Sequence, residues 1–421
     1  KSIVLKGAGA GNTIIIFGMP DPGGYVRDEL IQFSQGPATP FRVTGFTFRQ
    51  NVRSTALGLF TFYGTGKNWR IDHNTFEELG EVSASIYVSA HTYGLFDNNH
   101  FVGDNRILIN FDYNKDPISW QEPLALGSMK ALYVEDNVFD SDHGNIIDAH
   151  DGTRYVIRYN DISGGYIEAH GVQYGRGTRS YEIYENDITD NENIWVPMAL
   201  RGGTGVIFNN RMHGFSSSAL RVNIYYDRSE HATQLGICDG TSEYDGNDPA
   251  YMDTTPGYPC LDQIGRSTDY SATEVHPQKL DPLYEWNNFQ DGEDMDIIVH
   301  STYKPFGHLE EGRDFYNDKE KIGYTPFAYP HVYRTDCNNY PLLCDGDSGP
   351  VSNCIDNDQD GYGSAGSSGC TYSGVDCNDS AWYQNPGAPD TCDGYDNDCD
   401  GTVDEGCDDD NDGYCDSSIR F

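Results

Sequence analysis

Short segments with alternating apolar and polar positions recur along residues 40–215, and each segment runs into an asparagine that is followed two positions later by an apolar residue. Alternation of this kind predicts a β-strand with one face inside the fold. Because no single repeat can bury that face alone, neighbouring repeats must stack, roughly 4.8 Å apart. Six asparagines mark the repeats: Asn74, Asn99, Asn137, Asn160, Asn186 and Asn210.

The intervals between these asparagines are 25, 38, 23, 26 and 24 residues. All but one match a single coil of a parallel β-helix, and residues 112–129 supply the insertion that the 38-residue interval requires. Asparagine tolerates left-handed backbone geometry, and its side chain can hydrogen-bond the same side chain in the next coil. We therefore expect an asparagine ladder at a sharp turn, which is a structural role.

A second pattern repeats an alanine, preceded in two coils by an acidic residue and followed in three by histidine. The aligned alanines are Ala90, Ala149, Ala169, Ala199 and Ala219. If they face inward, residues on either side of them face outward on one sheet. The outward residues of two neighbouring coils would then be Asp148, His150, Glu168 and His170.

On these repeats the sequence resembles the pectate-lyase-like superfamily of right-handed parallel β-helices. Residues 2–15 resemble a first coil, and residues 311–317 with 323–331 resemble a closing segment of secreted β-helix proteins. The resemblance implies an all-β solenoid over residues 1–335. Residues 224–300 break the repeat and contain no clear coil, so we expect an irregular excursion there that returns near 296–300. The superfamily includes lyases, hydrolases, adhesins and phage tail parts, so it implies a fold and leaves the activity open.

Charge and hydropathy exclude several classes of partner. The formal net charge is −39, which repels the phosphates of nucleic acids and anionic membranes. No apolar run approaches membrane-spanning length, and no window sustains the apolar spacing of a long amphipathic helix.

The acidic residues are concentrated at the C-terminus, where residues 351–421 hold 17 Asp or Glu against one basic residue, Arg420. Three segments there place carboxylates at positions 1, 3 and 5 before a glycine at position 6. Oxygen ligands at this spacing suit calcium, and the glycine permits a sharp turn. The expected metal ligands are Asp356, Asp358, Asp360, Asp376, Asp379, Asp396, Asp398, Asp400, Asp404, Asp408, Asp410 and Asp412.

These segments depart from the EF-hand pattern, because Ser367 and Cys407 fall where its bidentate glutamate is required. The missing ligand would come from Asp376, Asp379, Asp404 or Glu405. The segment resembles the acidic metal-binding repeat of MopE-type surface proteins and is similar to thrombospondin type 3 repeats. The resemblance implies a metal-binding module at 353–421, for which the ligand spacing indicates calcium, and a solvated acidic tail is the alternative. Residues 336–352, which contain Cys337 and Cys344, are expected to form a linker before it.

All 11 cysteines lie in the C-terminal half, which indicates disulfides made in an oxidising compartment and a secreted or cell-surface protein. We expect the local pairs Cys238–Cys260 and Cys337–Cys344. Connectivity among the last seven cysteines stays open. The odd count leaves one unpaired, for which Cys415 is the natural candidate, and the first residue, Lys1, suggests a processed form or a fragment.

Candidate catalytic residues come from the outward positions of the second pattern. Asp148, His150, Glu168 and His170 would lie on adjacent coils, close enough to share a metal or a sugar, with Arg201 nearby, as are Arg154 and Arg176. The two acids also suit a glycosidase pair. The alternative is simple stacking of surface residues, because His91 indicates that the histidine is partly positional. Neither a full lyase signature nor a phosphate-binding glycine loop is present.

The sequence therefore predicts an extracellular or cell-surface β-helix with a structural, adhesive or glycan-binding role, stabilised by calcium. Its expected partner is a polysaccharide or cell-surface glycan, bound by aromatic and acidic side chains. A polysaccharide lyase or glycoside hydrolase is the alternative, and whether the protein is an enzyme stays open. Self-association is a further expectation, since bare β-helix ends invite stacking.

Overall fold

The structure is a computed structural model, and the chain divides into two compact units. The β-sheet unit comprises Lys1–Arg334 and Tyr340–Leu343, and the C-terminal unit comprises Thr335–Asn339 and Cys344–Phe421. The described residues are 3–17, 30–34, 40–50, 59–63, 65–78, 85–89, 91–103, 106–110, 118–141, 144–171, 177–191, 194–217, 219–222, 262–267, 279–300, 309–345, 362–364, 374–379, 381, 384–386, 388 and 395–403.

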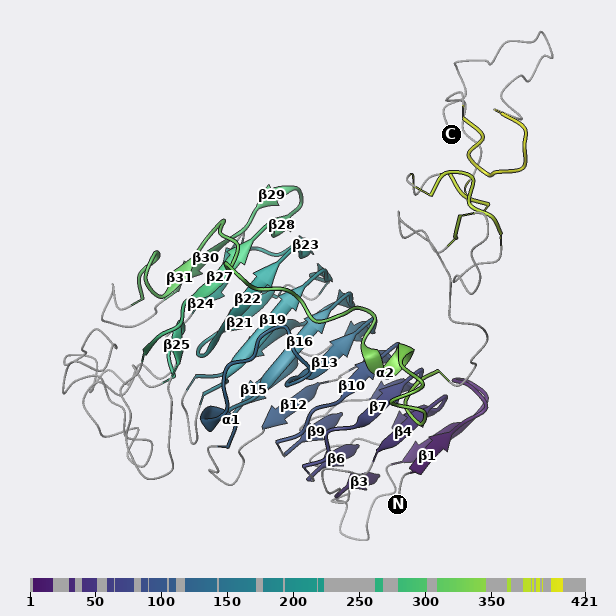
Figure 1. The fold of residues 1–421 in the computed structure, drawn as a ribbon, viewed down its shortest axis with the longest axis horizontal. Helices are drawn as coiled ribbons and strands as arrows, with labels where there is room; N and C mark the ends of the chain where they lie inside the picture. The colour runs from purple at the N-terminus through teal and green to yellow at the C-terminus, as the bar shows by residue number, and fades with distance from the viewer. Residues whose placement is uncertain are drawn as a thin grey trace. The chain divides into compact units, whose positions relative to one another are not determined.

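The β-sheet unit is nearly all-β in its described part and consists of three long sheets (Figure 1). Sheet A contains β1 (Ile3–Lys6), β4 (Phe41–Thr44), β7 (Trp69–Asp72), β10 (Leu95–Asp97), β13 (Leu132–Glu135), β16 (Arg154–Arg158), β19 (Ser180–Tyr184), β22 (Thr204–Phe208), β27 (Leu283–Trp286) and β31 (Phe315–Tyr316). Sheet B contains β2 (Ile14–Phe17), β5 (Thr47–Gln50), β8 (Thr75–Glu78), β11 (His100–Gly103), β14 (Val138–Ser141), β17 (Asp161–Ser163), β20 (Asp187–Thr189), β23 (Arg211–His213), β28 (Phe289–Gln290) and β29 (Glu293–Asp294). Sheet C contains β3 (Ile31–Phe33), β6 (Phe60–Phe62), β9 (Ile86–Val88), β12 (Ile107–Asn110), β15 (Asn145–His150), β18 (Tyr166–Ala169), β21 (Met198–Leu200), β24 (Ala219–Val222) and β30 (Asp296–Val299).

Through β24 the chain visits sheets A, B and C in turn, so each sheet takes every third strand. Neighbouring strands pair in parallel, apart from the antiparallel pair β28–β29 at one edge. One passage through the three sheets is called a coil below, and this strand order is the order that a parallel β-helix requires. The remaining described elements are short: α1 (Ile118–Gln121), α2 (Val332–Thr335) and the antiparallel pair β25 (Arg266–Ser267) and β26 (Lys279–Leu280).

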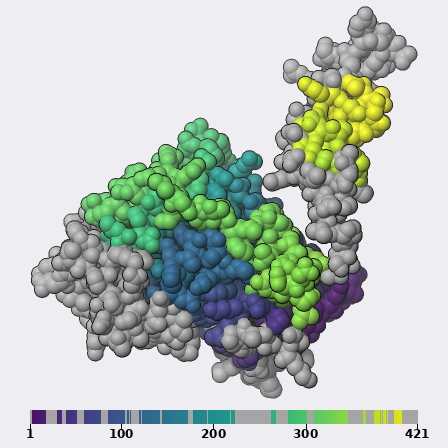
Figure 2. Space-filling model, viewed as in Figure 1, coloured from purple at the N-terminus to yellow at the C-terminus, as the bar shows by residue number. Residues whose placement is uncertain are grey.

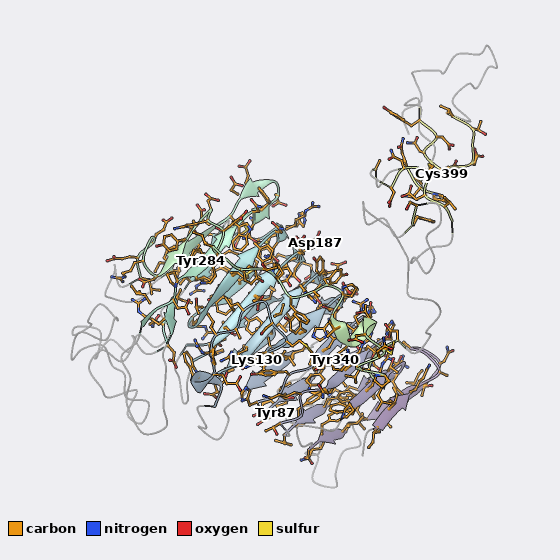
Figure 3. All side chains as sticks on the ribbon, viewed as in Figure 1. Tyr87, Lys130, Asp187, Tyr284, Tyr340 and Cys399 are labelled. Carbon is orange, nitrogen blue, oxygen red and sulfur yellow. A yellow bond between two sulfur atoms is a disulfide. The ribbon has the colours of Figure 1, made fainter. Side chains whose placement is uncertain are left out.

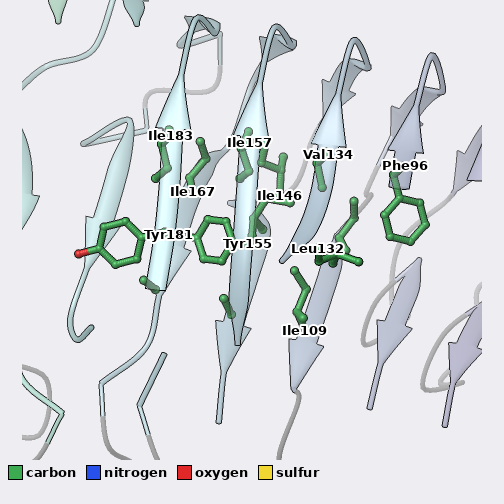
Figure 4. Close-up of a cluster of buried hydrophobic side chains, with 14 of the residues drawn as sticks. Phe96, Ile109, Leu132, Val134, Ile146, Tyr155, Ile157, Ile167, Tyr181 and Ile183 are labelled. Atoms are coloured by element: carbon green, nitrogen blue, oxygen red, sulfur yellow. The ribbon is translucent and has the colours of Figure 1, made fainter. Parts of the chain in front are cut away.

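Inward side chains of the three sheets form one continuous apolar core. In sheet B the rings of Phe76, Phe101 and Phe139 stack at centroid distances of 4.9 and 4.6 Å. In sheet A the inward positions of successive coils fill with aliphatic and tyrosine side chains, as Figure 4 shows for Leu132, Tyr155 and Tyr181. Each coil thus buries its apolar face against its neighbours, as the alternating pattern predicts.

The predicted asparagine ladder is present at the turn between sheets A and B. The side-chain oxygen of Asn186 accepts hydrogen bonds from the Asn160 backbone N–H and Nδ2, at 3.1 and 2.9 Å. Its Nδ2 donates to the carbonyls of Ile157 and Tyr184, both at 3.0 Å. The same contacts join all six predicted asparagines and extend one coil further, to Asn288.

One detail of the ladder differs from the prediction. The left-handed residue is the one that precedes each ladder asparagine, for example Tyr159 at φ 56° and Glu185 at φ 56°. Gly45 takes that position in an earlier coil at φ 80°, and there Phe46 replaces the asparagine. The role of the asparagine at this turn is therefore to make side-chain hydrogen bonds, because the left-handed conformation belongs to the residue before it.

From β7 to β27 the outer face of sheet A is covered by the closing segment, residues 309–334 with 340–343 (Figures 1 and 2). Outward ion pairs lie beneath it, including Arg70–Asp97 and Arg158–Glu135, each at 2.6 Å between nitrogen and oxygen. Arg158 also donates to the Phe327 carbonyl at 2.7 Å. The predicted closing residues 323–331 are part of this cover, which occupies the outer face of sheet A from β7 to β27.

The coil after residue 222 returns earlier than predicted. Within the expected excursion at 224–300, residues 283–286 already form β27 in sheet A, so the coil resumes there and not near residue 296. The sequence pattern did not indicate this strand because Glu285, an acidic residue, occupies an inward position in register with Ile207, where the alternation calls for an apolar residue. Burial raises the pKa of Glu285 to about 7, with a further contribution from Asp318.

We predict that replacing Asn186 by alanine destabilises the β-sheet unit by about 2–4 kcal/mol, because two carbonyls and one amide lose their buried partners. Denaturant unfolding followed by circular dichroism measures the change. The control is Asn191→Ala, which removes an exposed side chain and should change stability by less than about 0.5 kcal/mol. Equal stability of the two variants would contradict the structural role of the ladder.

A second prediction concerns pH. The pKa of Glu285 is raised in the folded state. Between about pH 4.5 and 7, Glu285 therefore stays protonated in the folded protein, whereas it is ionised in the unfolded chain. The contribution of Glu285 to stability is therefore present below pH 4.5 and lost as pH rises through 7. Glu285→Gln should raise the free energy of unfolding at pH 8 by on the order of 2 kcal/mol and should have little effect at pH 4.5. Unfolding curves in EGTA test this, and a variant that is less stable at pH 8 would refute it.

Candidate functional site

The outer face of sheet C carries the predicted array of acids and histidines. Asp148 pairs in register with Glu168, and Ala149 with Ala169, on the adjacent strands β15 and β18. Both alanines lie in the core, as predicted. The rings of His150 and His170 stack with centroids 3.6 Å apart.

Asp148 is the centre of this array and is 5% exposed. Its Oδ1 lies 2.6 Å from His150 Nε2 and 3.0 Å from His170 Nε2. Its Oδ2 accepts a hydrogen bond from Arg106 Nη1 at 3.0 Å. Burial raises the pKa of the Asp148 carboxyl, but the hydrogen bonds from the two imidazoles outweigh burial and hold that pKa well below its usual range. Burial lowers the pKa of His150; the hydrogen bond to Asp148 opposes this shift, and the charge of His170 adds to it.

Glu168 is buried more deeply and is paired with a cation. Arg201 contacts its Oε1, and Asn145 Nδ2 donates to its Oε2 at 2.7 Å. His170 Nε2 lies 3.4 Å from the same Oε1. With Asp148 and Glu168 both enclosed, the side chains left partly open to solvent are those of His150, Arg106 and Arg201. The burial of both acids therefore argues that they position their neighbours and do not contact a substrate directly.

A pocket of about 260 Å³ lies beside this array on the same sheet face. Its lining residues come from β18, β21, β24 and the segment before β21: Tyr166, Ile194, Trp195, Val196, Ala199, Arg201 and Arg221. The Arg221 guanidinium lies 3.9 Å from the centroid of the Trp195 ring, and that tryptophan is 42% exposed. Burial lowers the pKa of Arg221, and the charge of Arg201 lowers it further. The pocket thus places two cations beside a partly exposed indole, which also contacts the His300 ring at a centroid distance of 4.7 Å.

Part of the predicted second column is out of register. Ile86, Ile107 and Ile147 align, so the position of His150 corresponds to Asn110 and not to His91. His91 lies elsewhere and contacts the Tyr93 hydroxyl at 2.7 Å. The interpretation that His91, His150 and His170 occupy equivalent positions of successive coils is therefore wrong.

The prediction that the aligned alanines face inward is also wrong beyond Ala169. Ala199 pairs with Glu168 and with Arg221, so Ala199 faces outward, and Ala219 likewise pairs with Asp296. Methionine and leucine beside these alanines take the inward positions. This shift explains why sequence reasoning missed Arg221, which only the correct register places above Ala199.

The other predicted arginines have different positions. Arg154 is fully buried on sheet A and donates to the carbonyls of Ser119, Glu122, Pro123 and Leu124. It is a structural residue outside the array. Arg176 lies outside the described residues, as does Ala90. Sequence reasoning missed Arg106 and Trp195, for which spacing gave no signal because they lie before their strands on neighbouring coils. It also missed Tyr166, which the alternation could have indicated because Tyr166 lies two positions before Glu168 on β18.

In the C-terminal unit, Asp396, Asp398 and Asp400 place one carboxylate oxygen each within 4.8 Å of the others. The loop closes around them: the Gly401 N–H donates to Asp396 Oδ2 at 3.0 Å, and the Asp400 N–H contacts Asp398 Oδ1 at 3.1 Å. Gly401 has φ 97°, a left-handed conformation that favours glycine. The convergence predicted for positions 1, 3 and 5 is present in this segment.

Two other predicted ligands of this unit are also described. Asp376 is 5% exposed, and its Oδ1 accepts from the Asn378 N–H at 2.7 Å. Asp379 lies three residues along the same segment. The other expected ligands lie outside the described residues: Asp356, Asp358, Asp360, Asp404, Glu405, Asp408, Asp410 and Asp412.

Two disulfides are present in the described part of the C-terminal unit. Cys337–Cys344 was predicted and is confirmed. Cys377–Cys399 joins two of the seven cysteines whose connectivity the sequence left open, and Cys399 is labelled in Figure 3. This disulfide ties the segment of Asp376 to the aspartate loop. Cys238, Cys260 and Cys415 lie outside the described residues.

Comparison with known proteins supports the metal-binding character of this unit. Residues 376–405 match the family model Cu-binding MopE, whose description is "Putative metal-binding motif". No curated protein and no solved structure matches the chain significantly. Among the described residues, none of the helices is long and apolar enough to cross a membrane.

Proposed function

We propose that this protein is an extracellular or cell-surface right-handed parallel β-helix of the pectate-lyase-like type that binds a glycan on the outer face of sheet C. The observation that carries the proposal is the pocket formed by Trp195, Tyr166, Arg201 and Arg221. An exposed indole stacks on the apolar face of a sugar ring, and arginine binds hydroxyl and carboxylate oxygens. Arg221, together with Arg201, whose charge is balanced in part by Glu168, favours a glycan that carries carboxylate or sulfate groups.

The position of the pocket also supports glycan binding. Strands β18, β21 and β24 run parallel and present side chains at a regular spacing of about 4.8 Å. A repeating polymer can lie across several coils of such a face. Among the described strands of sheet A, β7 to β27 have their outer face covered by the closing segment.

A polysaccharide lyase or glycoside hydrolase is the second candidate. It is favoured by one observation, the proximity of Asp148, His150 and His170 to a pocket that contains Arg201. The burial of Asp148 and Glu168 counts against a glycosidase pair, because both carboxylates are enclosed by protein partners. Binding without cleavage is therefore the first proposal.

We further propose that the C-terminal unit binds calcium and that calcium stabilises it. Residues 376–405 contain neither histidine nor methionine, and two of their cysteines, Cys377 and Cys399, are joined in a disulfide. Copper prefers nitrogen and sulfur ligands, whereas carboxylate oxygens suit calcium. A unit with few large apolar residues also depends on metal and disulfides for its stability.

Glycan binding is tested with a panel of acidic and neutral polysaccharides, using calorimetry on wild type and Trp195→Ala. We expect an acidic polysaccharide to bind and the variant to bind it at least about fivefold more weakly, a loss of about 1 kcal/mol. The matched control is Phe289→Ala, an exposed aromatic on sheet B, which should bind as wild type. Absence of binding to every polysaccharide, or equal binding by Trp195→Ala, would refute the proposal.

The same panel separates the enzymatic candidate. Products are assayed with wild type and with the double variant His150→Ala/His170→Ala. We expect no product from wild type. Cleavage that is lost in the double variant would replace the binding proposal by the lyase or hydrolase.

Calcium binding is tested by titrating metal-free protein with Ca²⁺. We expect a Kd of roughly 10⁻⁴ to 10⁻³ M and a lower melting temperature of the C-terminal unit in EGTA. Asp398→Asn should remove one bound ion, because it takes one carboxylate from the three that converge. Asp336→Asn, which changes a partly exposed carboxylate of the same unit outside the aspartate loop, is the control. Tight Cu²⁺ binding without Ca²⁺ binding would overturn the assignment.

A further inference from the structure

The outer face of sheet C contains a second cluster of metal-ligating groups, separate from the aspartate loop of the C-terminal unit. Nε2 of His150, Nε2 of His170 and Oδ1 of Asp148 meet at one point, with nitrogen–oxygen distances of 2.6 and 3.0 Å. One ligand atom from each residue lies within 4.8 Å of the others. Adjacent ligands of an ion with bonds of about 2.0–2.1 Å lie about 3 Å apart, so the spacing suits a shared ion after a small outward movement.

We propose that Asp148, His150 and His170 form a binding site for a divalent first-row transition ion of the zinc class. Two imidazole nitrogens and one carboxylate oxygen are the donor set that such ions prefer, whereas calcium prefers oxygen alone. The proposal is independent of glycan binding by the neighbouring pocket.

The backbone explains why these three ligands converge. Asp148 and His150 are two positions apart on β15, so their side chains leave the same face of the strand. His170 follows β18, the next strand of the sheet, and its N–H donates to the Ala149 carbonyl at 2.8 Å. Two coils of the solenoid thus supply the ligands, and parallel stacking fixes their separation.

The neighbouring charges define which atoms take part. Arg106 donates to Oδ2 of Asp148, so Oδ1 is the oxygen directed at the imidazoles. Glu168 is paired with Arg201 and Asn145, so its carboxylate is already engaged and is not counted as a fourth ligand, although its Oε1 lies 3.4 Å from His170 Nε2. Three protein ligands on a partly open face leave a coordination position for water or for a ligand oxygen.

The test uses the full chain with millimolar Ca²⁺ present, so that the acidic loops of the C-terminal unit are filled. Zn²⁺ titration should show one site, with affinity at least tenfold lower in His150→Ala and in His170→Ala. Cu²⁺ then serves as a spectroscopic probe, because residues 335–421 contain no histidine. Electron paramagnetic resonance should show coupling to two imidazole nitrogens in wild type and to one in either single variant.

The matched control is His213→Ala. His213 lies on sheet B between two carboxylates, but Asp187 contacts its Nε2 and Asp291 its Nδ1, so the acids do not converge on one point. This variant should bind Zn²⁺ as wild type does.

Wild-type Zn²⁺ affinity in both His150→Ala and His170→Ala, or copper spectra without two-nitrogen coupling, would overturn the proposal and leave a hydrogen-bonded cluster. Because His150 is the more exposed ligand, its variant keeps the test decisive if His170→Ala fails to fold.

Discussion

The structure of the β-sheet unit depends on the hydrogen bonds that join one asparagine side chain to the next at the turn between sheets A and B. Each asparagine accepts from the coil below and donates to backbone carbonyls, so every coil is fixed in height and register against its neighbour. A slip of one residue would move the inward apolar set outward. The same register places Asp148 beside Glu168 and stacks His150 on His170. The candidate site is thus a consequence of coil stacking.

The sequence predicted the ladder and the coils because both recur at fixed intervals. It failed where the local pattern and the tertiary position disagree. Ala199 and Ala219 face outward, whereas Ala149 faces the core, because the short side chain of alanine fits either side of the sheet. Glu285 concealed a strand because an acid in an inward position contradicts the apolar pattern, and the raised pKa that burial gives it shows the energetic conflict.

The sequence predicted the acids and histidines of the candidate site but did not predict the neighbouring pocket. Asp148, His150, Glu168, His170 and Arg201 come together as expected. Trp195 and Arg221 join them from later coils, and only the three-dimensional register brings an indole under a guanidinium. The burial of Asp148 and Glu168 changes their interpretation, because enclosed carboxylates orient imidazoles and arginine more readily than they reach a substrate. In the C-terminal unit the ligand spacing alone predicted the convergence of Asp396, Asp398 and Asp400.

The most direct test of this account is hydrogen–deuterium exchange at the ladder amides, since the backbone N–H groups of Asn99, Asn137 and Asn160 donate to the side chain of the next asparagine. If coil register rests on these bonds, the three amides should exchange only when the whole unit unfolds, at the rate of the core strands β13 and β16. Exchange of the ladder amides within seconds, while the core strands stay protected, would show that the coils are held in register by something else.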